Sequence, residues 1–228
     1  MMLMTMLKKL NVSQITAKLN QPFSTVNVAR VGDIVVSIYI CQGMLEWHKH
    51  LDNDELFWVY EGTILLESEW GEVRLRPGEL AVVPKGVEHR SSSGLRAGVL
   101  LLRCGFVPER KNGHRRLYAL ASEVRLKRVS LPGAVRALTL PFQFHTVARI
   151  EETVIQVAWG VGTWPVEIPV PHDLLLFVLE GTATARTSQS MLHLHPGDFT
   201  VVPRGTVYQL STTRGTALVQ VIREDVKA

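Results

Sequence analysis

The chain contains an internal repeat, and this feature constrains its fold more than any other. A shift of 119 residues, without a gap, places DELFWVYEGT (54–63) on DLLLFVLEGT (173–182) and RPGELAVVPKG (76–86) on HPGDFTVVPRG (195–205). Across residues 54–89, 13 of 36 aligned positions are identical, whereas average residue usage would give about two by chance. The sequence therefore predicts two copies of one domain, each of ordinary domain size.

Each copy is predicted to be all-β. Short segments rich in Val, Ile, Leu and aromatic residues are separated by Gly and Pro; in the first copy they are IVVSIYI, ELFWVYEG, EVRLRPG, ELAVVP and GVLLLR. Helical periodicity is weak, and its best candidate is residues 115–127 between the copies. Evenly spaced strands with such turns are typical of a sandwich or a closed barrel. We therefore expect two tandem β-barrels.

Four side chains of the first copy form a candidate metal site. His48 and His50 are two residues apart, so on a strand both imidazoles face the same side. Glu55 opens the next strand at the head of an apolar face, where an unpaired carboxylate is costly. His89, after a Pro-Gly turn, adds a fourth side chain from a third strand. The spacing indicates that all four converge on one interior point.

Three imidazoles and one carboxylate suit a transition metal. This N/O ligand set fits Mn, Fe, Co, Ni, Cu or Zn and leaves positions open on an octahedral ion. We therefore expect one divalent transition metal held by His48, His50, Glu55 and His89. Substrate or water can take the open positions, and the sequence does not choose the metal.

These residues resemble the two signature motifs of the cupin superfamily. The first motif, Gly, His-any-His, Glu, Gly, is matched by Gly43, His48, His50, Glu55 and Gly62. The second, Gly, Pro-any-Gly, His, is matched by Gly78, Pro84, Gly86 and His89. Four residues rather than five separate Gly43 from His48, and Ser93 stands where an Asn is often found. The resemblance implies a double-stranded β-helix, or jelly roll, with the metal in its mouth; the first copy is most similar to small cupins labelled mannose-6-phosphate-isomerase-like.

The second copy lacks a comparable ligand set. Under the same shift the four positions fall on Glu167, Pro169, Leu174 and Tyr208, and proline and leucine offer no side-chain ligand. The remaining histidines of this copy fit surface or loop roles better than ligation. We therefore predict a metal-binding cupin barrel at residues 1–112, a basic connector at 113–135 and a degenerate barrel without a metal site at 136–228.

Two classes of function fit these features. The first is a metal-dependent enzyme on a small polar metabolite, either an isomerase of a sugar or keto acid or a dioxygenase, because a bound metal polarises carbonyls or activates water or dioxygen. The second is a non-catalytic bicupin that binds a small molecule or is structural, with a metal that only stabilises it. Phe57, Arg90 and Arg103 are candidate substrate-binding residues, and the catalytic base is unassigned. Strand alternation turns Trp58 and Tyr60 away from Glu55, toward the partner barrel or a dimer interface.

Charge and composition narrow the partners. The formal charge of +4 comes from a basic cluster between residues 109 and 136, in which Tyr118 is the one residue of Phe, Tyr or Trp type, unlike a nucleic-acid surface with several interleaved aromatic residues. No run of eighteen apolar residues is present, which argues against a membrane span. Cys41 and Cys104 are isolated in sequence, which is typical of buried reduced thiols. We therefore expect a cytoplasmic protein with a small-molecule substrate and neither a nucleic-acid nor a membrane partner; a homodimer is compatible with this.

Overall fold

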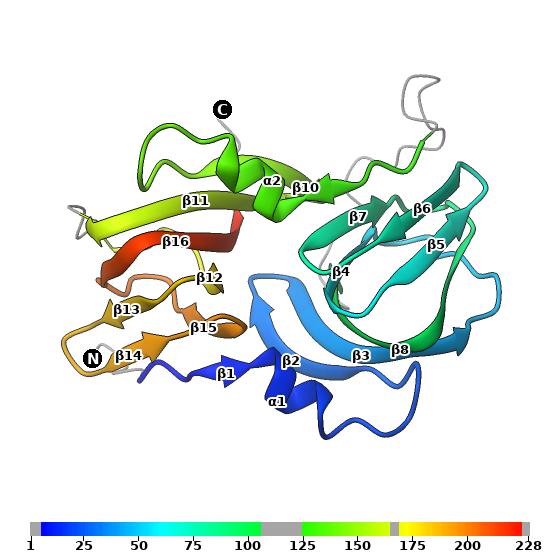
Figure 1. The fold of residues 1–228 in the computed structure, drawn as a ribbon, viewed down its shortest axis with the longest axis horizontal. Helices are drawn as coiled ribbons and strands as arrows, with labels where there is room; N and C mark the ends of the chain where they lie inside the picture. Colours follow the sequence, from blue (N-terminus) through cyan, green and yellow to red (C-terminus); the bar gives the residue numbers. More distant parts are fainter. Residues whose placement is uncertain (1–5, 106–124, 165–168, 225–228) are drawn as a thin grey trace.

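The chain folds into two β-barrels that lie side by side (Figure 1). The computed structural model describes residues 6–105, 125–164 and 169–224. The helical candidate at 115–127 therefore lies largely outside the described residues. Within those residues each barrel is an eight-stranded antiparallel sheet curled on itself, which confirms the all-β, two-barrel expectation.

The first barrel consists of strands β2 to β9, in which β8 pairs with β3, β4 and β5. All five sequence segments predicted as strands are strands here. The bounds are β2 (Val26–Val31), β3 (Ile34–Met44), β4 (Glu55–Glu61), β5 (Ile64–Ser68), β6 (Gly71–Leu75), β7 (Glu79–Val83), β8 (His89–Cys104) and β9 (Val129–Ser130).

The second barrel repeats this order with β16 in the place of β8. Its bounds are β1 (Leu10–Asn11), β10 (His145–Ile150), β11 (Thr153–Thr163), β12 (Leu174–Glu180), β13 (Ala183–Arg186), β14 (Met191–Leu194), β15 (Asp198–Val202) and β16 (Gln209–Arg223). None of the helices in the described part of the chain is long and apolar enough to cross a membrane.

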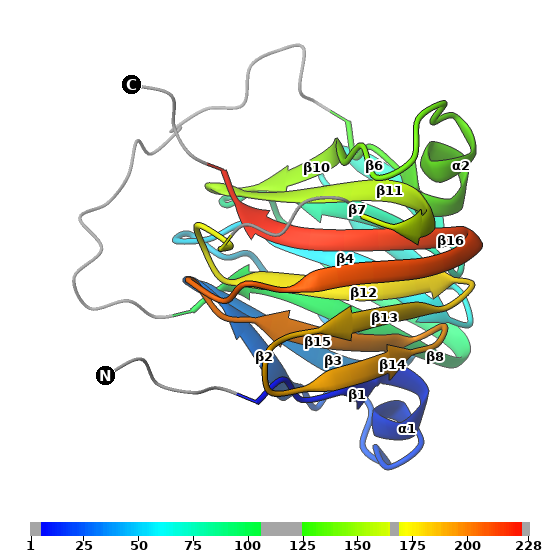
Figure 2. The ribbon, with the colours of Figure 1, turned by 90° about the vertical axis from the view of Figure 1, so that its left-hand side faces the viewer.

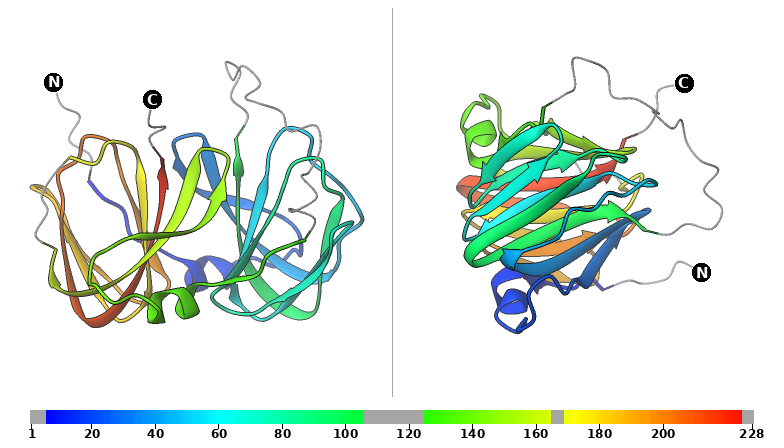
Figure 3. Two further views of the ribbon diagram at one scale, coloured as in Figure 1. Left: turned by 90° about the horizontal axis from the view of Figure 1, so that it is seen from above. Right: turned by 90° about the vertical axis from the view of Figure 1, so that its right-hand side faces the viewer.

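The two barrels exchange their first strands. β1, from the start of the chain, pairs with β15 of the second barrel, and β9, inside the predicted connector, pairs with β7 of the first. Figure 2 shows β1 at the edge of the second barrel, and Figure 3 shows the N-terminal segment running from that barrel to the first. The predicted boundaries do not capture this exchange, because the pairing is between distant segments and leaves no local pattern in the sequence. The rest of the predicted division stays a prediction.

A short helix follows each exchanged strand at a position that the 119-residue shift relates. The helices are α1 (Val12–Thr16) and α2 (Leu131–Arg136), capped by the side chains of Asn11 and Ser130. Val12 N donates to Gly197 O at 3.0 Å and Leu131 N donates to Gly78 O at 2.9 Å, which are equivalent contacts in the two directions. The repeat therefore extends into the N-terminal segment, and the two copies are related by an approximate two-fold axis.

One apolar core joins the barrels. Trp58 of β4 and Phe177 of β12 occupy equivalent positions, and their ring centroids are 4.6 Å apart. Tyr60 contacts the same Phe177 ring, at 6.3 Å between centroids. Side chains of both repeats complete this cluster, so the sequence-based orientation of Trp58 and Tyr60 toward the partner barrel is confirmed. Two further clusters fill the barrel interiors, and Cys41 and Cys104 are buried and are not joined in a disulfide, as predicted.

Candidate metal centre

Two strands and one loop bring the four predicted ligands together at the mouth of the first barrel, so His48 and His50 lie on a loop rather than on the strand that the sequence predicted. His48 and His50 lie on the segment that leads from β3 to β4, Glu55 is the first residue of β4, and His89 is the first of β8. His48 and His89 face each other across an isolated β-bridge, in which each backbone N–H donates to the other's carbonyl at 3.0 and 2.9 Å. The ligand atoms of all four residues lie within 4.8 Å of one another, so the cluster could hold a metal ion.

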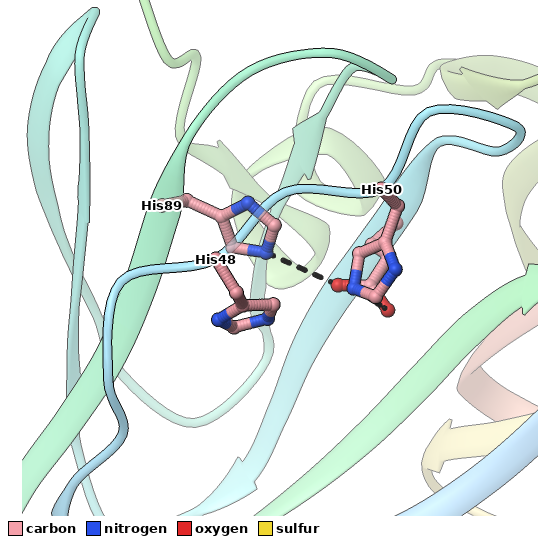
Figure 4. Close-up of side chains that lie close together, drawn as sticks. His48, His50 and His89 are labelled. Carbon is pink, nitrogen blue, oxygen red and sulfur yellow. Dashed lines mark hydrogen bonds and ion pairs between the residues drawn. The ribbon is translucent and has the colours of Figure 1, made fainter.

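Backbone carbonyls orient two of the three imidazoles through the ring nitrogen that faces away from the cluster. His48 Nδ1 lies 2.9 Å from Glu46 O, and His89 Nδ1 lies 3.0 Å from Val87 O. Because a carbonyl only accepts, these contacts place the proton on Nδ1 and leave Nε2 as the free electron pair. Such outer contacts are the usual way in which metal-binding histidines are fixed. Figure 4 shows the three rings turned toward one another.

The contacts of His89 test whether a cation fits. Its Nδ1 faces a carbonyl oxygen, and its Nε2 lies 3.2 Å from Glu55 Oε2. A neutral imidazole carries one N–H, yet here both ring nitrogens face acceptors. His89 is 1% exposed, so water cannot resolve the mismatch. The ring must therefore carry a second proton or share a cation with Glu55, and the donor set fits a metal ion.

Glu55 is held ionised in this pocket. Burial by itself raises the pKa of the carboxyl, but the hydrogen bonds and positive charge of His50 and His89 outweigh burial and lower the pKa to about 2. His50 Nε2 lies 3.2 Å from Glu55 Oε1, and this contact raises the pKa of His50. An ionised carboxylate beside three imidazoles is a strong ligand set for a divalent ion.

Two of the three predicted substrate-binding residues lie beside the cluster. Phe57 is buried on β4, and its ring centroid is 5.8 Å from that of His89 in an edge-on arrangement. Arg103 pairs with Glu55 across β4 and β8, and its Nη1 lies 3.7 Å from Glu55 Oε1. The Arg103 side chain is 34% exposed, so its guanidinium stands at the barrel mouth between the cluster and solvent.

The structure does not bring Arg90 into the cluster. Arg90 follows His89 on β8, so its side chain leaves the opposite face of the strand. Its Nε and Nη2 donate to the two carboxylate oxygens of Glu67 at 2.8 and 2.9 Å. The guanidinium also lies over the Trp47 ring, 4.9 Å from the centroid. Arg90 is thus engaged on the outer surface.

Sequence reasoning missed a buried polar group in the barrel interior. Tyr39 and Cys41 lie two residues apart on β3 and are buried, and the Tyr39 hydroxyl is 3.4 Å from Ser91 Oγ. Burial raises the pKa of Tyr39 far above its usual range and that of Cys41 to about 11, so both stay protonated. Counting back in twos from Gly43 places both residues on one face, a signal that could have identified them.

The corresponding part of the second barrel is apolar. Leu174 and Tyr208 are buried at the positions of Glu55 and His89, among Val170 and other apolar side chains. Gly205 N donates to Val170 O as Gly86 N donates to His50 O, so Val170 rather than Pro169 is the structural counterpart of His50. Glu167 lies outside the described residues. In the described part of the chain, His48, His50, Glu55 and His89 are the one group that could hold a metal.

Fold and site together define a protein of two jelly-roll barrels with one His/Glu cluster. The family model for the cupin domain matches residues 38–93, which include all four cluster residues. The uncharacterized protein YdbB of Bacillus subtilis is 32% identical over 92 residues, which are 40% of this chain and 81% of that protein. This chain belongs to the cupin family.

Solved structures show that the likeness in fold extends over both barrels. The match to a cupin 2 conserved barrel domain protein from Leptotrichia buccalis spans 98% of this chain and 100% of that protein's chain, with a TM-score of 0.72 and 9% sequence identity. Salicylate 1,2-dioxygenase from Pseudaminobacter salicylatoxidans covers 97% of this chain with a TM-score of 0.69 and 12% identity, over 86% of its own length. At these identities the likeness concerns the fold alone.

Proposed function

We propose that this cupin binds one divalent transition metal through His48, His50, Glu55 and His89 and is an enzyme acting on a small anionic metabolite. The observation that carries the proposal is His89, whose two ring nitrogens both face oxygen acceptors in a buried setting. A cation shared with Glu55 satisfies that arrangement without an added proton.

The chain's own residues divide the work at this site. The four ligands leave coordination positions open, and a bound metal supplies Lewis-acid chemistry or activates a bound small molecule there. Phe57 closes the inner wall with an apolar ring, which keeps bulk water from the cluster. Arg103 provides a positive charge at the mouth, where a substrate carboxylate or phosphate would meet it.

Two features favour an anionic substrate at Arg103. The 3.7 Å approach to Glu55 is longer than a hydrogen bond, so the guanidinium donors are not consumed by that carboxylate. A metal that takes Glu55 as a ligand weakens this contact further. Isomerisation of a sugar phosphate or a keto acid, and oxygenation of an aromatic acid, would each present such an anion to Arg103.

Elemental analysis of the purified protein tests metal binding. We expect about one equivalent of a divalent metal in the wild type and close to none in a His48→Ala, His50→Ala double variant. A His193→Ala, His195→Ala variant of the second barrel is the matched control and should keep the metal. Equal metal content in all three proteins would refute the site.

Turnover is tested separately from binding. Protein loaded with Mn, Fe, Ni or Zn is assayed against sugar phosphates, keto acids and aromatic acids, with dioxygen uptake followed in parallel. We expect activity with one of these anions and a rise in KM in Arg103→Ala that Arg103→Lys partly restores, whereas Arg90→Ala leaves KM unchanged. Metal binding without turnover on any substrate would favour a non-catalytic binding protein.

A further inference from the structure

A residue of the second barrel contacts the segments that carry the metal ligands of the first. Glu151 lies in the turn between β10 and β11, and its Oε1 accepts a hydrogen bond from the backbone N–H of Asp54 at 3.4 Å. The backbone N–H of Glu151 donates in return to Asp54 Oδ2 at 3.4 Å. Asp54 immediately precedes the ligand Glu55, so this two-way contact acts on the start of β4.

The same carboxylate reaches a second ligand-bearing segment. Lys85 Nζ lies 3.4 Å from both carboxylate oxygens of Glu151, and the backbone N–H of Lys85 donates to Asp54 Oδ1 at 2.9 Å. The next residue, Gly86, donates its N–H to the carbonyl of His50 at 2.7 Å. Because this turn leads into His89, the contacts join the segments of His50, Glu55 and His89.

The repeat shows which of these contacts belong to the common scaffold. In the second barrel the backbone N–H of Arg204 donates to Asp173 Oδ1 at 2.9 Å, the equivalent of the contact from Lys85 to Asp54. The position equivalent to Glu151 in the first repeat is Gly32, which has no side chain to offer. The Glu151 carboxylate therefore acts on the first barrel, which has the ligand cluster, and Gly32 offers no carboxylate at the equivalent position to act on the second barrel.

The backbone at Glu151 has a conformation that normally favours glycine. Its φ is 51°, a left-handed conformation that favours glycine, and Gly32 adopts the equivalent φ of 58°. A glutamate at this turn is unfavourable for the local backbone. The side chain is 12% exposed and that of Lys85 is 19% exposed, so their ion pair is partly shielded from solvent and salt.

We propose that Glu151 is a positioning residue for the metal centre, through which the second barrel fixes the geometry of the ligands in the first. The inference rests on the proposed metal site. It assigns a role to the second barrel, whose own counterpart of the cluster is apolar. The β10–β11 turn of that barrel binds Asp54 and Lys85, and these two residues lie on the segments that carry the ligands.

Glu151→Gly is the decisive variant, because it installs the residue that the first repeat has at this turn and relieves the left-handed conformation while removing the carboxylate. Glu151→Gln keeps an acceptor for the Asp54 N–H and is the conservative variant. Glu152→Ala is the matched control, since Glu152 pairs with Arg223 within the second barrel and its side chain is half exposed. The probe is Co²⁺, whose visible spectrum reports ligand geometry and whose affinity is measured against a competing chelator.

We expect Glu151→Gly to weaken Co²⁺ affinity by roughly tenfold to 100-fold, the usual effect of losing an outer contact to a metal site, and to alter the spectrum at saturation. Glu151→Gln should recover part of the affinity, and Glu152→Ala should match the wild type. Denaturant midpoints of the metal-free proteins are measured alongside, and they should agree closely. Wild-type affinity and spectrum in Glu151→Gly would overturn the inference.

Amide exchange of the metal-free proteins separates this inference from the proposed metal site. If Glu151 positions the ligand segments, exchange in residues 50–55 and 84–89 is faster in Glu151→Gly than in the wild type or Glu152→Ala. If wild-type protein binds no Co²⁺ at the His/Glu cluster, the proposed function fails, while the exchange result still decides whether Glu151 orders these segments. Unchanged exchange would overturn the inference independently of metal.

Discussion

The shared core predicts that damage in one barrel is felt in the other, and Phe177→Ala is the variant that tests it. Phe177 is fully buried on β12 and contacts Trp58 and Tyr60 of the first barrel as well as Phe199 of its own. Truncation of a buried phenylalanine removes its apolar contacts and leaves a cavity, at a cost of roughly 3–5 kcal/mol. Trp58 and Tyr60 of the first barrel would line part of that cavity.

Hydrogen exchange measured by mass spectrometry localises the effect. If the barrels unfold together, the slow amides of β4 and β12 lose protection equally, and 3–5 kcal/mol corresponds to a loss of more than about 100-fold in both. Met191→Ala, on an exposed side chain of the second barrel, should stay within about 0.5 kcal/mol of the wild type.

Trp58→Phe sharpens the reasoning from the other side of the core. The Trp58 Nε1 is buried without a hydrogen-bond partner, so the substitution keeps an aromatic ring against Phe177 while removing an unsatisfied donor. We expect it to cost clearly less than Phe177→Ala. Loss of protection confined to β12 in Phe177→Ala would refute the shared core, because it would mean that the barrels open independently.

Three further predictions concern pH, metal and a turn. Burial alone would raise the pKa of Asp198, but its contacts with Asn11, the backbone N–H of residue 195 and Lys9 lower it, so the stabilisation it provides is present above its ordinary pKa and is lost as pH falls through the lowered one. The difference in unfolding free energy between wild type and Asp198→Asn, from denaturant titrations at about pH 6 and about pH 3, should therefore narrow on acidification, and a constant difference would contradict this. A divalent metal at 100 times its Kd should stabilise the wild type by about 2.7 kcal/mol in thermal unfolding, an effect that chelation or loss of the cluster histidines abolishes. Gly62→Ala should destabilise strongly, because a Cβ there would lie 2.7 Å from a backbone oxygen at a φ of 75°, whereas Gly71→Ala meets no neighbour and should cost only its backbone conformation; equal unfolding midpoints for both would count against the steric argument.

Local patterns in the sequence were sufficient for the barrels and the cluster. The repeated Pro-Gly and Glu-Gly turns and the apolar segments between them predict the strands, because turn chemistry and alternation are properties of neighbouring residues. His48, His50 and Glu55 lie close together in the chain, so their spacing was enough to predict the cluster, although His48 and His50 lie on a loop and not on a regular strand. His89 required the second motif as well, since its place depends on how β8 pairs.

Contacts between segments that are distant in the chain could not be predicted from the sequence. Arg90 and Arg103 are equally good candidates for anion binding in the sequence. In the structure, β8 pairs with β5 so that Arg90 binds Glu67, and β8 pairs with β4 so that Arg103 lies beside Glu55. Glu151 gave no signal, because its partners lie in the other repeat. What sequence cannot supply here is the register between strands and the docking of one barrel on the other.

The exchange of β1 and β9 has a consequence for how the protein is made. During synthesis the first barrel cannot complete its sheet until residues 129–130 have emerged, although most of its strands are finished by residue 104. The opening strand of the chain must wait still longer, for β15 near the end. Neither half of the chain contains all the strands of a barrel, so a gene split between the repeats would yield two products that each leave an unpaired sheet edge until they meet.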